Sequence, residues 1–301
     1  MRLEDYPNLL ILNKLVAPIE LSTKKLRDIS AHIEDSNHDV VVHGLFVMAV
    51  SSMEVMLSDV LEYFLVSFPM KLPNNDFKFE KEIFFDYYFA LLKKTAETHI
   101  TGLSYKSFED YFKKAIDYFS IEWPDFFEVI GNDIKEIRAT RNLLLHNNLI
   151  LNDQYRSTAG IKKRGGSGRI KVDKPYLKQT IVIFLSFEEQ LRLKLSEKYK
   201  EYTKINANKR LWKFLFTTPV MPYDHFWDYD EKTDTIYALK KGKYEEQLSN
   251  SETLLLSLWR TQFQFCKFNE HMVHFNMLHF DSHNKEKILF FLSIASDFPF
   301  E

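Results

Sequence analysis

The feature that most constrains the fold is a long apolar run at residues 40–68, VVVHGLFVMAVSSMEVMLSDVLEYFLVSF. It contains no proline and a single glycine. Its length and composition approach those of a membrane-spanning helix. It also carries ionisable side chains that are costly in lipid, namely His43, Glu54, Asp59 and Glu62. We therefore predict a buried helix of a soluble protein, which ends before Pro69 and Pro73 because proline cannot continue a helix.

Helical periodicity extends through most of the chain and predicts an all-α protein. Ser104 or Ser107 is expected to cap the helix over residues 105–119. The helix over residues 124–148 is expected to bend at Gly131. The Gly/Ser-rich stretch 157–171 predicts a flexible loop. Helices are expected over residues 21–35, 39–68, 76–98 (stopping before Gly102), 105–119, about 124–148, 175–202, about 250–268 and 284–296.

The sequence changes character near residue 205, where prolines and aspartates become frequent. One short alternating run, Thr235–Leu239, predicts a small hairpin within otherwise irregular structure. We predict two parts: a helical bundle over residues 1–205 and a smaller, mainly helical appendage over residues 206–301.

Composition narrows the classes of function. A formal net charge of −2 gives no global attraction to nucleic acid or to anionic lipid, so any polyanion site must be a local patch. Cys266 is the only cysteine, so no internal disulfide can form and a reducing compartment is expected. The first residues lack the basic region and cleavage site of a signal peptide. We expect a cytoplasmic protein that has no membrane partner.

Residues 141–148, RNLLLHNN, combine polar and apolar side chains on one predicted helix. At about 100° per residue, Leu143 and Leu144 fall on one side of this helix. The opposite arc holds the polar set Arg138, Arg141, Asn142 and His146. We expect Arg141 and His146 to face a shared cavity and not the core of the bundle.

This set of side chains suits RNA cleavage without a metal. An imidazole can act as a general acid or base near neutral pH, and a guanidinium matches phosphate oxygens. A ribose 2′-hydroxyl would attack the adjacent phosphate and leave a 2′,3′-cyclic phosphate and a 5′-hydroxyl. One helix supplies one such histidine, so a two-fold dimer would supply both a base and an acid. A structural role stays open, because a histidine is also favoured in the last turn of a helix.

The spacing R-N-x-x-x-H, from Arg141 to His146, resembles the signature of the HEPN superfamily. The preceding IKEIRAT and the asparagines that follow are similar to the helix that carries this motif. The segment AVSSMEVMLSDVLEYF, residues 49–64, resembles the long early helix of HEPN domains of the RiboL-PSP group. The resemblance covers roughly residues 20–202 and does not extend to the C-terminal third.

The resemblance implies an all-α bundle that forms a homodimer, with an RNA-cleaving site at the dimer cleft. Arg141 and His146 would have the family's arginine and histidine roles, and Asn142 its polar position. The expected function is a metal-independent endoribonuclease without cofactors, a toxin or anti-phage defence effector, with an antitoxin or sensor protein as a possible partner. The alternative is a catalytically silent dimeric module that binds RNA or protein, since some members have lost catalysis.

Several charged residues outside the motif are open to two interpretations. The basic stretch KKRGGSGRIK either contacts the RNA backbone or is a solvated loop; its candidates are Lys162, Lys163, Arg164, Arg169 and Lys171. Arg138 either assists phosphate binding or pairs with Glu136 or Asp133. Glu54 either pairs with one of the arginines or lies at the edge of the bundle.

The C-terminal third contains histidines at spacings of three and four residues, with a cysteine upstream. These residues either bind zinc or form an aromatic packing surface, and no pair matches a known zinc signature. They are Cys266, His271, His274, His279 and His283.

Overall fold

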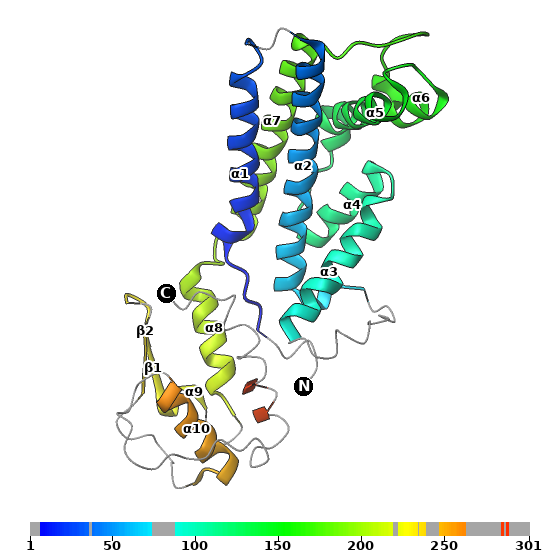
Figure 1. Ribbon diagram of the computed structural model, residues 1–301. Helices are drawn as coiled ribbons and strands as arrows, with labels where there is room; N and C mark the ends of the chain where they lie inside the picture. Colours follow the sequence, from blue (N-terminus) through cyan, green and yellow to red (C-terminus); the bar gives the residue numbers. More distant parts are fainter. Residues whose placement is uncertain are drawn as a thin grey trace. The chain divides into compact units, whose positions relative to one another are not determined.

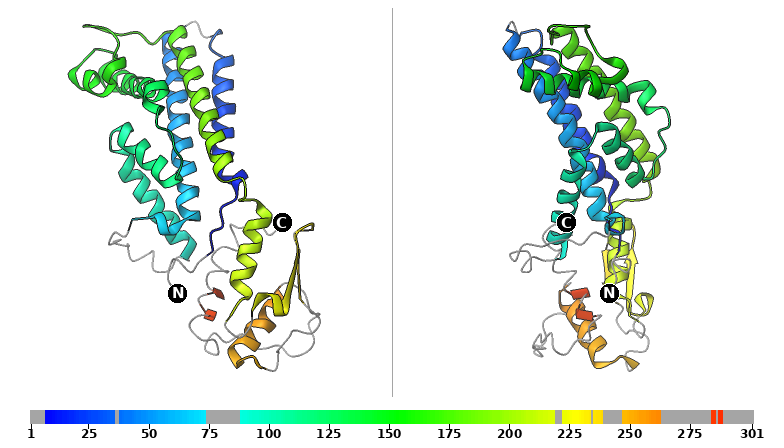
Figure 2. Two further views of the ribbon diagram at one scale, coloured as in Figure 1. Left: turned by 180° about the vertical axis from the view of Figure 1, so that it is seen from behind. Right: turned by 90° about the vertical axis from the view of Figure 1, so that its right-hand side faces the viewer.

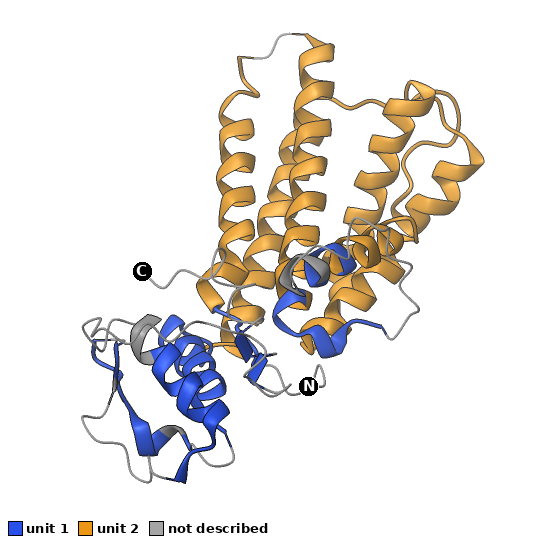
Figure 3. Cartoon of the chain, turned by 60° about the horizontal axis from the view of Figure 1, so that its bottom comes forward, with its two compact units in different colours: residues 1–11, 66–95, 201–301 blue, residues 12–65, 96–200 orange. Residues whose placement is uncertain are grey.

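A computed structural model describes residues 7–35, 38–73, 88–218, 222–233, 235–238, 247–262, 284–285 and 287–288. The chain forms two compact units, drawn in different colours in Figure 3. The bundle unit comprises residues 12–65 and 96–200, and the second unit comprises residues 1–11, 66–95 and 201–301. The second unit therefore also includes two earlier segments that a single division at residue 205 assigns to the bundle.

Three long helices run side by side in the bundle unit: α1 (Leu12–Ala31), α2 (Asp39–Ser67) and α7 (Lys174–Lys198) (Figure 1 and Figure 2). The all-α prediction is confirmed, because helices dominate and the described residues contain only one two-stranded sheet. The α1 helix begins well before the expected residue 21 and includes Pro18.

The α2 helix is long and apolar enough to cross a membrane by length and composition, and 44% of its most apolar window is buried inside the protein. One face fills the core of the bundle unit with Phe46, Val50, Met53 and Leu57. A helix that packs one face into a protein core passes the same test of length and composition.

The next two helices are α3 (Tyr88–Ser104) and α4 (Phe108–Phe119). The predicted end before Gly102 is wrong, since α3 continues to Ser104. Residues 76–87 of that predicted helix lie outside the described residues. Of the two expected caps it is Ser107 that starts α4, where its hydroxyl accepts a hydrogen bond from the backbone N–H of Asp110.

The motif helix α5 (Asn132–Asn147) follows a π-helical turn at Phe127–Gly131. A Cβ at Gly131 would lie 2.5 Å from a ring carbon of Phe126, so only glycine fits. The π-turn ends at Gly131, the residue at which the sequence predicts a bend. At the other end, Asn148 adopts a left-handed conformation with φ of 47°, which caps α5.

The stretch 157–171 differs from the predicted flexible loop. A short helix, α6 (Asp153–Ala159), and a 3₁₀ turn, Gly160–Lys162, come first. The chain then returns beside the end of α5, where Leu151 N–H donates to Gly168 O at 2.8 Å and Ile170 N–H donates to Leu149 O at 3.0 Å. In Figure 1, α5 lies beside α2, and α6 packs against α5 on the side away from α2.

The second unit contains α8 (Lys204–Phe216), α9 (Tyr223–Phe226), the strands β1 (Trp227–Asp230) and β2 (Thr235–Ala238), and α10 (Asn250–Gln262). The predicted hairpin is confirmed by the antiparallel pairing of β1 with β2. The α8 helix was not predicted; its apolar stripe includes Leu211 and Leu215. The predicted helix at 284–296 lies mostly outside the described residues.

Candidate functional site

The α5 helix presents two arginines to a single carboxylate on α2. Arg141 Nη2 lies 2.5 Å from Glu54 Oε1 and 2.5 Å from Oε2. Arg138 Nε donates to Glu54 Oε1 at 2.6 Å, and its guanidinium lies 5.1 Å from the centre of the Phe108 ring. Of the open interpretations, the pairing of Glu54 with arginine is therefore present, and it involves both arginines. Arg138 pairs with Glu54 and not with Glu136 or Asp133.

The guanidinium of Arg141 keeps part of its hydrogen-bonding capacity. Its side chain is 20% exposed, and its Nε is buried without a hydrogen-bond partner. A buried donor without a partner is unusual, because burial removes its hydration without replacement. Arg141 thus has one donor that Glu54 does not use, and this donor lies inside the protein.

A separate pocket of about 230 Å³ lies between α5 and α6. His146 and Asn142 contribute to it from α5, and both side chains are exposed to solvent. The complete lining is Ala139, Asn142, Leu143, His146, Asn147, Asn152, Gln154, Tyr155 and Thr158.

The motif residues are thus divided between two faces of α5. Asn142 and His146 line the pocket, while Arg141 contacts Glu54 of α2. Residues five apart on a helix point about 140° from each other, so this separation follows from the spacing. The expected cavity shared by Arg141 and His146 is not formed within one copy of the chain. The expectation that His146 avoids the core is met.

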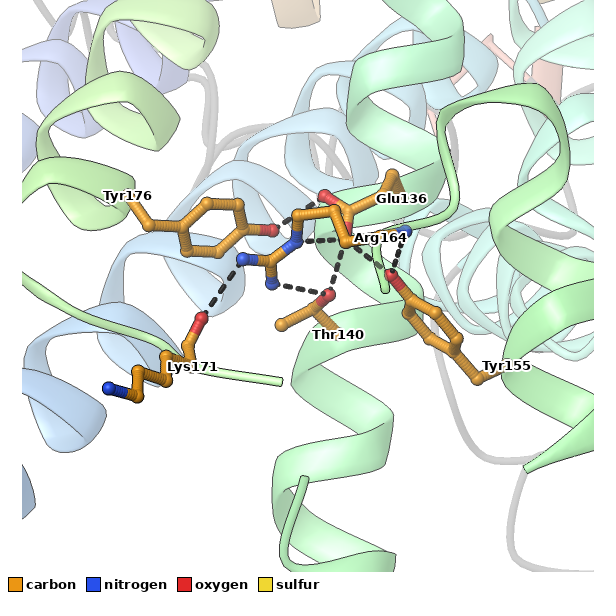
Figure 4. Close-up of polar contacts among 6 residues, drawn as sticks. All are labelled: Glu136, Thr140, Tyr155, Arg164, Lys171 and Tyr176. Atoms are coloured by element: carbon orange, nitrogen blue, oxygen red, sulfur yellow. Dashed lines mark hydrogen bonds and ion pairs between the residues drawn. The ribbon is translucent and has the colours of Figure 1, made fainter. Parts of the chain in front are cut away.

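On the side of α5 away from Arg141, several polar side chains surround the buried carboxylate of Glu136 (Figure 4). Glu136 is 5% exposed, and its Oε1 accepts hydrogen bonds from Thr140 Oγ1 at 2.6 Å, Tyr155 OH at 2.8 Å and Arg164 Nε at 2.8 Å. Its Oε2 accepts a hydrogen bond from Tyr176 OH at 2.7 Å. A buried charge is tolerated when it is paired and fully hydrogen-bonded, and this set meets both conditions.

Arg164 fastens the basic stretch to α5 and α7. Besides Glu136, its guanidinium donates to Lys171 O at 2.9 Å and to Thr140 Oγ1 at 3.1 Å. It also lies 3.6 Å from the centre of the Tyr176 ring (Figure 4). Sequence reasoning placed Arg164 among RNA contacts, but here protein groups occupy its guanidinium.

The other basic candidates lie nearer to solvent. Lys162 forms an ion pair with Asp133 at 3.1 Å, and Arg169 donates to Asn148 Oδ1 at 2.5 Å. Lys163 is exposed. Their contacts with Asp133 and Asn148 are at the surface, where such interactions contribute little and can be exchanged for a ligand.

Burial raises the pKa of the Tyr155 phenol, and the neighbouring Glu136 adds to this effect. Burial likewise raises the pKa of Tyr176, with the charge of Glu136 the next cause. Both phenols therefore stay protonated and act as donors to Glu136 across the physiological pH range.

Sequence reasoning missed the pocket residues of α6 and the role of Glu136. One signal could have indicated Glu136: it lies next to Ile137 on the side of the helix that carries the apolar residues, so it must be buried with partners. Gln154 and Thr158 had no such signal, because two uncharged polar residues on a short helix are common.

Within the described ranges, no group of three His, Cys, Asp or Glu side chains is placed to hold a metal ion. Cys266 and the C-terminal histidines named above lie outside those ranges.

Comparison with known proteins adds no assignment: no protein-family model, curated protein or solved structure matches this chain.

Proposed function

We propose that this chain is a metal-independent endoribonuclease of the HEPN type, in which His146 transfers a proton and Arg141 stabilises charge on the scissile phosphate. The observation that carries the proposal is the set of polar side chains that α5 presents. An exposed imidazole borders a pocket, and the same helix holds a guanidinium with an unused donor. The type of reaction, RNA cleavage, is inferred from the resemblance of R-N-x-x-x-H to the HEPN signature.

The proposed reaction is an internal transesterification. The ribose 2′-oxygen forms a bond to the adjacent phosphorus as the bond from phosphorus to the 5′-oxygen of the next nucleotide breaks. A base accepts the 2′-hydroxyl proton, and an acid gives a proton to the departing 5′-oxygen. Arg141 would stabilise the negative charge that develops on the phosphate oxygens.

Glu54 fits a positioning role in this scheme. Its two oxygens hold Arg141 at one terminal nitrogen and leave Nε unpaired. The same contacts leave Glu54 little capacity to bind a divalent cation, which requires several free oxygen ligands. In this proposal, proton transfer by imidazole and charge stabilisation by guanidinium carry the reaction without a metal.

A homodimer would supply the second imidazole and bring an arginine near it. Support comes from a stripe of exposed residues on α2, where Val41, Met48 and Val55 recur every seven residues and are 44%, 47% and 57% exposed. Gly44 and Ser51 lie between them, and a Cβ at Gly44 would meet nothing within 4 Å. Apolar residues at this spacing with small residues between them suit close packing against the same helix of a second copy.

The alternative function is a silent HEPN module that binds RNA or protein. One observation favours it: Glu54 already neutralises part of the charge that a phosphate would need. A catalytic role predicts cleavage that depends on His146, whereas a silent module predicts binding alone. A cytoplasmic toxin or anti-phage effector, with an antitoxin or sensor protein as a partner, is the proposed context of the ribonuclease.

Incubating the full-length protein with single-stranded RNA in EDTA tests the function. The proposal expects fragments that end in a 2′,3′-cyclic phosphate and begin with a 5′-hydroxyl. Single strands are the expected substrate, because a regular duplex resists in-line alignment of the 2′-oxygen with its phosphate. RNA that stays intact at high protein concentration would leave the silent module as the better account.

A further inference from the structure

The pocket between α5 and α6 has a chemistry of its own. Its polar side chains are carboxamides, hydroxyls and one imidazole, and none of its lining residues is Lys, Arg, Asp or Glu. An anionic phosphate or a cationic amine would normally be held by an opposite charge. The pocket therefore suits a neutral ligand with several hydrogen-bonding groups.

Some of these polar groups are used by the fold and others are not. Asn147 Nδ2 donates to Ile150 O at 2.6 Å, and Asn152 Oδ1 accepts from the backbone N–H of Tyr155 at 2.8 Å. By contrast, Asn142 and Gln154 make no side-chain hydrogen bond within the described part of the chain. Two carboxamides, one from each helix, are thus available to a ligand.

The pocket has the right size for a single planar ring system. Its volume of about 230 Å³ is below the roughly 300–1,000 Å³ typical of pockets for drug-sized ligands. Ala139 and Leu143 give it an apolar floor, and Leu143 is 3% exposed. A nucleobase combines an apolar face with a polar edge, which matches this division.

The α6 wall of the pocket is fixed in advance. Tyr155 lines the pocket and is 3% exposed, and its hydroxyl donates to the buried Glu136 at 2.8 Å. The backbone N–H of Arg164 donates to the same hydroxyl at 3.0 Å. A wall held in this way loses little conformational freedom when a ligand binds.

We propose that the α5–α6 pocket is a binding subsite for one adenine base of a single-stranded RNA, selected by the carboxamides of Asn142 and Gln154. A carboxamide can donate to N7 and accept from the 6-amino group of adenine at the same time. Guanine offers two acceptors at this edge, and uracil and cytosine have no ring nitrogen there. The subsite rests on the proposed function only in that its base belongs to the RNA whose phosphate reaches His146, which lines the same pocket.

The test measures binding separately from cleavage. The probes are fluorescent 2′-fluoro oligouridylates that carry adenine, guanine, cytosine or uracil at one central position and have no 2′-hydroxyl to react. Fluorescence anisotropy with the full-length protein should show roughly tenfold tighter binding of the adenine probe, as expected for one bidentate contact.

Variants of α6 leave the proposed catalytic residues intact. Gln154→Ala should remove most of the adenine preference, and Gln154→Glu should remove part of it, because Glu keeps the acceptor and loses the donor. Ser157→Ala is the matched control, since Ser157 lies on α6, is exposed and does not line the pocket. It should bind all four probes as the parent does.

Equal affinity for the four probes, or an adenine preference that survives Gln154→Ala, would overturn the subsite. RNA cleavage combined with equal affinity would leave the ribonuclease in place and remove only the subsite. Adenine preference without any cleavage of ordinary RNA would remove the ribonuclease and keep the subsite, as part of a silent binding module.

Discussion

Arg141 and Glu54 join α5 to α2 through one terminal guanidinium nitrogen that lies 2.5 Å from each carboxylate oxygen. Arg138 shares the same carboxylate, so Glu54 separates two positive charges that would otherwise face each other. The three side chains are between 19% and 25% exposed, and solvent therefore screens their interaction only in part.

Glu54→Gln should lower both stability and activity. The loss of the shared negative charge should cost about 1–2 kcal/mol of unfolding free energy, below the value for a fully buried pair. RNA cleavage should fall by about tenfold through kcat, because Arg141 loses its orientation. Urea unfolding and steady-state kinetics measure the two effects. Unchanged kcat in a stably folded variant would remove the positioning role from Glu54.

Arg164→Met should destabilise the bundle unit by about 3 kcal/mol. The substitution leaves Glu136 buried without its positive partner, although its hydrogen bonds from three hydroxyl groups remain. Arg156→Met is the matched control, because Arg156 is 42% exposed and pairs with an aspartate that is 99% exposed. Equal urea midpoints for the two variants would contradict the role assigned to Arg164.

Glu188 should make the stability of the protein depend on pH. It is completely buried, accepts hydrogen bonds from Ser22 Oγ at 2.6 Å and Thr23 Oγ1 at 2.7 Å, and burial raises its pKa above the ordinary value of 4.5. A raised folded-state pKa favours the protonated form, so the stabilisation is complete below pH 4.5 and is lost as pH rises through the folded-state pKa.

Glu188→Gln should remove this component, because an amide does not titrate. The difference in unfolding free energy between the parent and Glu188→Gln should therefore change in favour of the variant from pH 4.5 upward. Urea titrations at a series of pH values measure it. A difference that stays constant over this range would mean that Glu188 has no raised pKa.

The exposed stripe on α2 should form the proposed dimer interface. Met48→Glu should convert the dimer to a monomer, because it places like charges at the two-fold contact. Val182→Glu is the control: Val182 is 65% exposed on α7, outside the stripe. Light scattering on both variants at micromolar concentration measures the effect. A parent protein that is monomeric with and without RNA would contradict the interface.

Much of the helical framework could be predicted from sequence, because apolar periodicity and capping residues are local signals. Residues 39–68 and the start near Pro175 were recognised in this way. The α8 helix was missed because prolines and aspartates beyond it suggested irregular structure, although Thr203 accepts a hydrogen bond from Asn206 N–H and caps it. The discontinuous make-up of the second unit depends on tertiary contacts that no local pattern encodes.

The site could be predicted only as a helix with a polar arc. Helical geometry alone placed Asn142 and His146 on neighbouring positions, and both line the pocket. The direction of Arg141 depends on Glu54, which is far from it in sequence. The position of Arg164 could not be predicted either. It forms an ion pair with Glu136, whereas a basic, glycine-rich stretch is usually a solvent-exposed loop.

The most direct test of the central claim compares RNA cleavage in EDTA by the parent, His146→Ala, Arg141→Ala and Leu145→Ala. Leu145 is the control, since it is 52% exposed beside His146 and does not line the pocket. His146→Ala should slow cleavage by about 10²–10⁴-fold through lost proton transfer, and Arg141→Ala by about 10²–10³-fold through lost charge stabilisation. Leu145→Ala should cut as the parent does. Cleavage by His146→Ala at the parental rate, or activity in the parent that requires added metal, would contradict the account.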